Sequence, residues 1–198
     1  MEGKIKRIGI YLGSFDPIHI GHVNTIIKVL NENLVDYVLI VPCAQNPWKD
    51  HKPVSLEKRR QMIRLLDIDI VGKVGVSDCD SKIKPDENGE YYAYQSLELI
   101  KEEIENNNDK FDDEPELSII AGTDVALDIP KWKNSEWILS NFKVINIDRP
   151  GYSVYDDFKG INISSTDIRD MIKKGLNPIP WVPAEVWHYI KEEGLYKK

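Results

Sequence analysis

The stretch that decides the fold class reads IGIYLGSFDPIHIGH and covers residues 8–22. It opens with an apolar run, Ile8 to Leu12, which ends at Gly13. From Ile18 to Leu30, apolar residues recur at steps of three and four, the spacing of a helix with one buried face. The stretch therefore predicts a strand, a tight loop and a helix, in that order.

The same order repeats along the chain. Apolar runs predict further strands at 37–41, 71–77, 117–121 and 142–147, and helical spacing appears at 55–66, 94–105 and, in part, 136–139. Two polar segments, 81–90 and 106–116, are interpreted as surface loops. Because strands that alternate with helices form parallel sheets, we expect an α/β fold: a Rossmann-like open parallel sheet with helices on both faces.

The end of the chain predicts a small C-terminal helical extension. One helix is expected at 166–174, stopped by Gly175, and a second has Pro183 in its first turn and Gly194 just past its end. The sequence shows neither an internal repeat nor a linker. We therefore expect residues 1–198 to form a single domain, with the tail, residues 163–198, completing it.

Composition and charge exclude several classes of function. Lys and Arg number 26 against 33 Asp and Glu, and the net charge of -7 gives no field for a nucleic-acid backbone, so the phosphate ligand should be small. Cys43 and Cys79 have neither metal-site nor disulfide spacing and are interpreted as buried thiols in a reducing compartment. No apolar run approaches the roughly 18 residues that cross a bilayer. We expect a soluble, cytoplasmic protein with no nucleic-acid or membrane partner.

The loop after the first strand carries the first chemical motif, at the position where open parallel sheets bind nucleotides. Gly13 is expected to permit a tight turn close to phosphate oxygens, next to the positive N-terminus of the following helix. His19 and His22 would share a face of its first turn and donate to one phosphate chain, with Gly21 leaving room for the ligand. A lone histidine is more often a core or surface residue, and a zinc site would lack a third ligand at suitable spacing. Two histidines around a glycine at this position favour a phosphate site.

The second motif, ISSTDIR, covers residues 163–169. Ser164 and Asp167 have the spacing of a capping box, so the simplest interpretation is a well-capped helix. Capping leaves Arg169 unexplained. Its guanidinium can fold back toward the helix N-terminus, where hydroxyl and amide groups would hold an anion. The motif is therefore interpreted as a second phosphate clamp.

With these two motifs, the chain resembles the bacterial nicotinate-nucleotide adenylyltransferases of the nucleotidyltransferase superfamily, whose T/HxGH signature reads HIGH at 19–22. The resemblance covers nearly the whole chain. Besides 13–22 and 163–169, it includes residues 46–49, 122–124, 130–132, 149–152, 182–183 and 194–196.

The resemblance implies adenylyl transfer from ATP to nicotinate mononucleotide, which gives deamido-NAD and pyrophosphate in NAD biosynthesis. Mg²⁺ bound mainly through the ATP phosphates is expected on general grounds, because hard oxygen ligands suit it and the sequence shows no protein cage for a metal. The resemblance also implies catalytic roles for His19, His22 and Arg169. The implied ATP-binding residues are Gly13, Ser14, Phe15, His19, Gly21, His22, Lys49, Ser165, Thr166 and Arg169. The implied mononucleotide-binding residues are Asp16, Tyr92, Ala93, Asp124 and Trp132. A core position is the alternative interpretation of Trp132.

Three departures from the family pattern concern the acceptor. Ala93 stands where many members have a hydroxyl, Trp48 where many have a histidine, and Gly160 where some have a bulky aromatic. Nicotinate and nicotinamide mononucleotides therefore both stay open as acceptors. A pantetheine-phosphate adenylyltransferase and a non-catalytic nucleotide sensor are the alternative functions. The sequence gives no indication of an oligomeric state.

Overall fold

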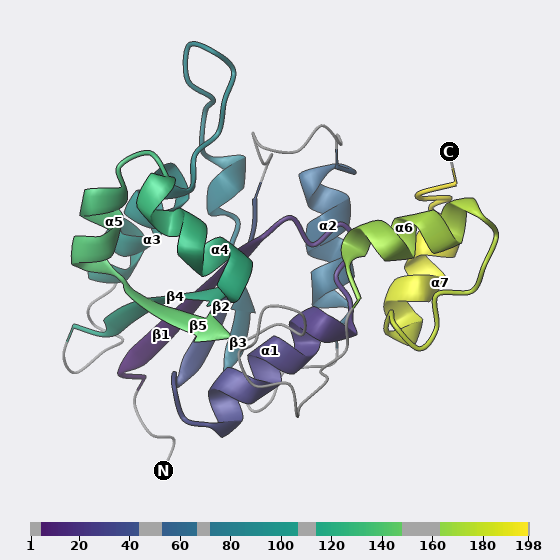
Figure 1. Cartoon of the computed structure of the whole chain (residues 1–198), viewed down its shortest axis with the longest axis horizontal. Helices are drawn as coiled ribbons and strands as arrows, with labels where there is room; N and C mark the ends of the chain where they lie inside the picture. The colour runs from purple at the N-terminus through teal and green to yellow at the C-terminus, as the bar shows by residue number, and fades with distance from the viewer. Residues whose placement is uncertain (1–4, 44–52, 67–71, 107–113, 148–162, 198) are drawn as a thin grey trace.

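The computed structural model describes residues 5–43, 53–66, 72–106, 114–147 and 163–197. In these ranges, five parallel strands form one sheet in the order β3-β2-β1-β4-β5 (Figure 1). The strands are β1 (Arg7–Gly13), β2 (Tyr37–Pro42), β3 (Val74–Val76), β4 (Glu116–Gly122) and β5 (Lys143–Ile147). The helices are α1 (Ile20–Asn31), α2 (Leu56–Arg64), α3 (Ala93–Glu105), α4 (Thr123–Asp128), α5 (Ser135–Asn141), α6 (Ser165–Lys173) and α7 (Ala184–Glu192), with short 3-10 turns η1 (Cys79–Ser81) and η3 (Ile129–Lys131).

Each face of the sheet has its own hydrophobic core, because side chains alternate along a strand. On β1, Ile8 and Ile10 face the core formed with α3 and α5, which contains Leu97 and Ile138. The other core contains residues of α1, α2, α6 and α7. This two-sided burial explains why the strands appear in the sequence as nearly continuous apolar runs, and it confirms the Rossmann-like fold.

The C-terminal helices lie beside α1 and α2 at one end of the sheet (Figure 1). Ile168 of α6 and Val186 of α7 are fully buried in the same core as Ile26 of α1. An ion pair of 3.0 Å joins Lys58 of α2 to Glu193, directly after α7. The tail therefore packs against the first half of the chain.

The boundaries differ from the predicted ones where capping decides them. Helix α1 begins at Ile20 rather than Ile18, because His19 is extended and caps the helix with its own side chain. Pro183 likewise precedes α7 as its N-cap instead of lying in its first turn. Helix α4 was not predicted because none of its residues is buried, so it lacks the apolar face that helical periodicity reveals.

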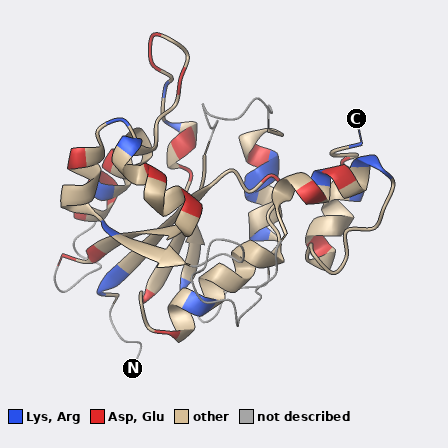
Figure 2. Ribbon diagram, viewed as in Figure 1, with Lys and Arg blue, Asp and Glu red and all other residues tan. Residues whose placement is uncertain are grey.

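Charged side chains of both signs are interspersed on the helices, whereas the strands are mostly uncharged (Figure 2). None of the helices in the described ranges is long and apolar enough to span a membrane.

Candidate active site

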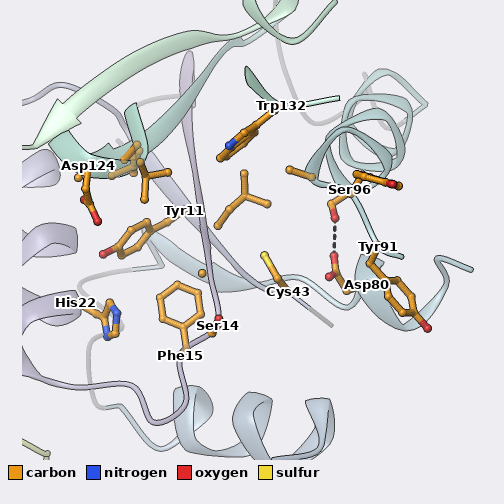
Figure 3. A pocket seen from close by; sticks show the side chains of 18 of the residues that line it. Tyr11, Ser14, Phe15, His22, Cys43, Asp80, Tyr91, Ser96, Asp124 and Trp132 are labelled. Atoms are coloured by element: carbon orange, nitrogen blue, oxygen red, sulfur yellow. Dashed lines mark hydrogen bonds between the residues drawn. The ribbon is translucent and has the colours of Figure 1, made fainter. Parts of the chain in front are cut away.

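A pocket of about 320 Å³ opens at the carboxyl edge of the sheet. It lies where β1 and β4 end side by side, so Leu12 and Gly13 meet Ala121 and Gly122 in its wall. The chain connections of β1 and β4 run to opposite faces of the sheet, and such a switch point is the usual ligand site of open α/β sheets. Figure 3 shows Tyr11, Phe15 and His22 on one side of this pocket and Asp80, Ser96 and Tyr91 on the other.

The loop after β1 is shaped by an aromatic side chain rather than by a glycine turn. Gly13 was expected to adopt a conformation that other residues resist, but the left-handed backbone falls at Phe15, with φ of 47°. A Cβ at Gly13 would lie 2.9 Å from the Phe15 ring. Glycine is needed here because the ring folds back over it, and the ring then meets the imidazole of His22 edge-on at 4.9 Å between centroids.

Both histidines of the motif are buried, and backbone contacts orient their rings. Nδ1 of His19 accepts the N–H of Gly21 at 3.1 Å, and Nδ1 of His22 accepts the N–H of His19 at 3.2 Å. With Nδ1 acting as an acceptor, the ring proton sits on Nε2. The two rings lie 3.7 Å apart between centroids. The donor of each imidazole is therefore Nε2.

Two amide groups at the start of α1, which were expected to face a phosphate, form hydrogen bonds within the protein instead. The N–H of Ile20 donates to the carbonyl of Trp181 at 2.9 Å, and that of Gly21 is used by His19. A Cβ at Gly21 would lie 3.0 Å from Cε1 of His19, so this glycine makes room for the imidazole. The tail thus caps α1, and an anion at this end would meet imidazole N–H groups instead of these two amides.

The second motif reaches the first across the fold. The hydroxyl of Ser165 donates to the carbonyl of Pro17 at 2.9 Å. The guanidinium of Arg169 folds back along α6, donating to the carbonyl of Asp16 at 2.7 Å and to the hydroxyl of Thr166 at 3.0 Å. Ser165 also lines the pocket together with His22. The two motifs therefore form one structural unit, although about 150 residues separate them.

Helix α6 begins with the capping box that its sequence predicts. The backbone N–H of Ser164 donates to the carboxylate of Asp167 at 2.9 Å, and the N–H of Asp167 donates to the hydroxyl of Ser164 at 3.1 Å. The hydrogen bonds from the Ser164 hydroxyl and then from its amide lower the pKa of Asp167. The N–H groups of the first helical turn are fixed in direction as a result.

Asp16 is positioned differently from its implied role in mononucleotide binding. Its side chain is buried and accepts the hydroxyl proton of Tyr196 at 2.6 Å and the N–H of Val54 at 3.3 Å. It does not lie among the residues that line the pocket. The carboxylate instead ties the motif loop to the tail and to the segment before α2, which identifies Asp16 as a positioning residue.

A buried arginine that sequence reasoning missed supports the same loop. Arg59 of α2 is fully buried and donates to the carbonyls of Ser14, Cys43 and Val54 at 2.7, 2.6 and 2.9 Å. Burial lowers the pKa of its guanidinium, and the charge of Asp16 opposes that shift. Nothing local distinguishes this arginine from the exposed charges of an amphipathic helix.

The remaining implied acceptor residues also line the pocket, and Asp124 lies on the side of Tyr11 and His22 (Figure 3). Tyr92 and Ala93 lie at the start of α3, Asp124 in the first turn of α4 and Trp132 directly after η3. Trp132 also packs against the core next to α3 and α5, so its two interpretations are compatible.

Further lining residues were not singled out from the sequence. They include Cys43, Asp80, Ser96 and Lys133. Ser96 donates to Asp80 at 2.7 Å on the pocket wall (Figure 3). Cys43 directly follows β2 and Asp80 lies shortly after β3, so their position beyond strand ends was the available signal.

Lys49, Trp48 and Gly160 lie outside the described residues. Within the described ranges, no three His, Cys, Asp or Glu residues come together in a way that could hold a metal ion.

The chain is similar to known proteins in sequence and in fold. A sequence model described as cytidylyltransferase-like matches residues 10–171. The chain is 30% identical to a Clostridium tetani protein named "Probable nicotinate-nucleotide adenylyltransferase", over 98% of this chain and 100% of that protein. Two structures of Plasmodium falciparum nicotinic acid mononucleotide adenylyltransferase share the fold. The one complexed with NaAD has a TM-score of 0.76 at 21% identity, and the one complexed with APC has 0.65 at 23%; each comparison covers 96% of this chain and 97% of the other.

Proposed function

The chain belongs to the cytidylyltransferase-like family, and on that premise we propose that it transfers the adenylyl group of ATP to nicotinate mononucleotide, giving deamido-NAD and pyrophosphate. The observation that carries this proposal is the joining of the two motifs by the bonds of Ser165 to Pro17 and of Arg169 to Asp16. They bring His22 and Ser165 into the wall of one pocket.

The triphosphate of ATP lies, in this proposal, at the junction of α1 and α6. His19 and His22 donate from Nε2, the start of α6 supplies the hydroxyls of Ser165 and Thr166, and Arg169 adds positive charge. Two bonds of the Arg169 guanidinium already hold the motif loop and Thr166, so the group is oriented before the ligand arrives. A guanidinium has five N–H donors, which leaves further ones for phosphate oxygens.

The rest of ATP and the acceptor occupy the body of the pocket. Gly13, Ser14 and Phe15 line the nucleotide next to the phosphates, with Gly21 giving His19 its position. We assign Lys49 to the ATP phosphates by resemblance alone.

The acceptor lies between α3 and the segment after α4. Trp132 offers an aromatic face to the pyridine ring, and Tyr92, Ala93 and Asp124 border it. In this proposal, the acceptor phosphate points toward the α-phosphorus of ATP.

The reaction needs alignment and charge neutralisation rather than a protein nucleophile. The acceptor phosphate is ionised at neutral pH, and one of its oxygens attacks the α-phosphorus of ATP in line as the bond to the β-phosphate oxygen breaks. Negative charge then grows on the departing pyrophosphate. Fixed donors at the start of α6 and on the two imidazoles stabilise that charge without having to reorganise.

We propose that magnesium reaches this site as an ion carried by the nucleotide. The described residues form no cluster able to hold it, and Mg²⁺ is commonly bound through substrate phosphates with several waters. The ion would supply additional neutralisation of the phosphates. We assign no protein ligand to it.

The test is release of pyrophosphate from ATP in the presence of nicotinate mononucleotide, nicotinamide mononucleotide or pantetheine phosphate. Nicotinate mononucleotide should support turnover. Removing one well-placed donor costs about a hundred- to a thousandfold in rate, so His19→Ala and His22→Ala should lose that much. His188→Ala is the matched control, because His188 lies exposed on α7 and pairs with Glu192.

Three outcomes would contradict the proposal. Near-normal turnover by a folded His19→Ala or His22→Ala protein would show that these histidines do not make the phosphate contacts assigned to them. Turnover with pantetheine phosphate alone would assign the chain to that activity. ATP binding with no turnover of any acceptor would indicate a nucleotide sensor.

A further inference from the structure

Lys133 is the one lysine or arginine among the described residues that line the pocket. It directly follows Trp132, which is proposed to contact the pyridine ring of the acceptor. The other lysine of this turn, Lys131, is more exposed, pairs with Asp128 at 2.8 Å and does not line the pocket. The pocket wall therefore contains a cation at one specific place.

The position of the Lys133 ammonium is set by two contacts. Its Nζ lies 4.1 Å from the centroid of the Tyr92 ring, within the range of a cation–π interaction. It also lies 3.6 Å from Oδ2 of Asp86, in the connection between η1 and α3. These contacts hold the ammonium next to the start of α3. Ala93 at that start carries no hydroxyl.

The acidic residues of the wall make this cation important for an anionic acceptor. Asp80 and Asp124 line the same pocket, and Asp80 is buried. Nicotinate mononucleotide has a carboxylate on its pyridine ring in addition to its phosphate, whereas nicotinamide mononucleotide has a neutral amide there. A second negative charge would be repelled by the two carboxylates unless a cation faces it.

We propose that Lys133 is a specificity-determining residue, whose ammonium binds the carboxylate of the pyridine ring and so selects nicotinate over nicotinamide mononucleotide. The inference rests on the proposed function, since it needs the pyridine ring at Trp132. The Lys133 side chain is 47% exposed, so the interaction is weaker than that of a buried ion pair.

The experiment compares kcat/KM for the two mononucleotides in the wild type and in Lys133→Met, Lys133→Arg and Lys131→Met. A charged hydrogen bond at a half-exposed site should change the ratio of the two kcat/KM values roughly tenfold. In Lys133→Met, kcat/KM for nicotinate mononucleotide should fall by that factor. The kcat/KM for nicotinamide mononucleotide and the KM for ATP should not change. Lys133→Arg should retain most of the preference, and Lys131→Met should retain all of it. Raising the ionic strength should lower the preference of the wild type for nicotinate over nicotinamide mononucleotide, because salt screens an exposed charge pair.

Two results would overturn this assignment. An equal loss for both mononucleotides in Lys133→Met would show that the ammonium contacts the acceptor phosphate or the ribose, which the two substrates share. Unchanged kcat/KM values for both mononucleotides would show that the ammonium contacts neither substrate. A wild type that turns over neither mononucleotide would instead refute the proposed function, which separates the two failures.

Discussion

Replacing Tyr196 by phenylalanine tests whether the end of the chain supports the motif loop. The Tyr196 hydroxyl donates to Oδ1 of Asp16 at 2.6 Å, and both side chains are buried. A hydrogen bond to a charged group contributes about 1.5–3 kcal/mol, so the substitution should lower the free energy of unfolding by about 2 kcal/mol. A second hydrogen bond to Oδ1, from the N–H of Val54, is longer at 3.3 Å and should not compensate fully. For a chain of this size, the loss corresponds to a fall in Tm of about 4–8 °C.

Urea unfolding followed by far-ultraviolet circular dichroism measures this change. The midpoint should fall while the slope stays the same, because the surface exposed on unfolding is unchanged. Tyr189→Phe is the control, since the Tyr189 hydroxyl forms no hydrogen bond with the described residues. A Tyr196→Phe protein whose stability lies within about 0.5 kcal/mol of the wild type, like a typical surface substitution, would refute the reasoning.

Three further predictions concern the ionisation of Tyr196, the glycine beside His19 and the reactivity of Cys79. Burial, together with the charge of Asp16, raises the pKa of Tyr196 above its ordinary value of 10.0. The neutral phenol therefore stabilises the fold below pH 10, and this contribution is lost as the pH rises further. Above pH 10, the urea midpoint of Tyr196→Phe should therefore fall less steeply with pH than that of the wild type. Gly21→Ala would place a methyl group 3.0 Å from the His19 ring, and pyrophosphate release should drop at least about tenfold with a melting temperature close to that of the wild type. Burial raises the pKa of the Cys79 thiol to about 12, so little of it is ionised at pH 8. In a folded Cys43→Ser protein, Cys79 should therefore react with an aromatic disulfide at least roughly a hundredfold more slowly than in the same protein unfolded in urea. Equal rates would show an accessible thiolate.

The hydrophobic pattern predicted the sheet because the central strands β1, β2 and β4 are buried on both faces and each major helix is buried on one. It failed where that signal is absent. Helix α4 has no buried residue, and the start of α1 depends on the side chain of His19 rather than on apolar spacing. Residues 123–131 were therefore assigned no helix, although Asp124 within them lines the pocket.

The site was predictable where a motif lies at a known place in the fold. Gly13, His22 and Ser165 line the pocket, as do Ala93 and Trp132. The residues that were missed lack a local signature. Arg59 resembles any charged residue of an amphipathic helix until its contacts with the carbonyls of Ser14 and Cys43 are known.

The sequence by itself determined the fold class, the two motifs and the cap of α6, because hydrophobic spacing and capping involve residues only a few positions apart. Only the tertiary structure decided that Asp16 supports the loop through Tyr196 and that a carbonyl of the tail accepts a hydrogen bond from an amide of α1. The same is true of the position of Lys133 in the pocket beside Tyr92. The Asp16–Tyr196 contact joins residues 180 positions apart. Such contacts depend on how the chain connections place whole elements on the sheet, and no periodicity along the chain encodes that placement.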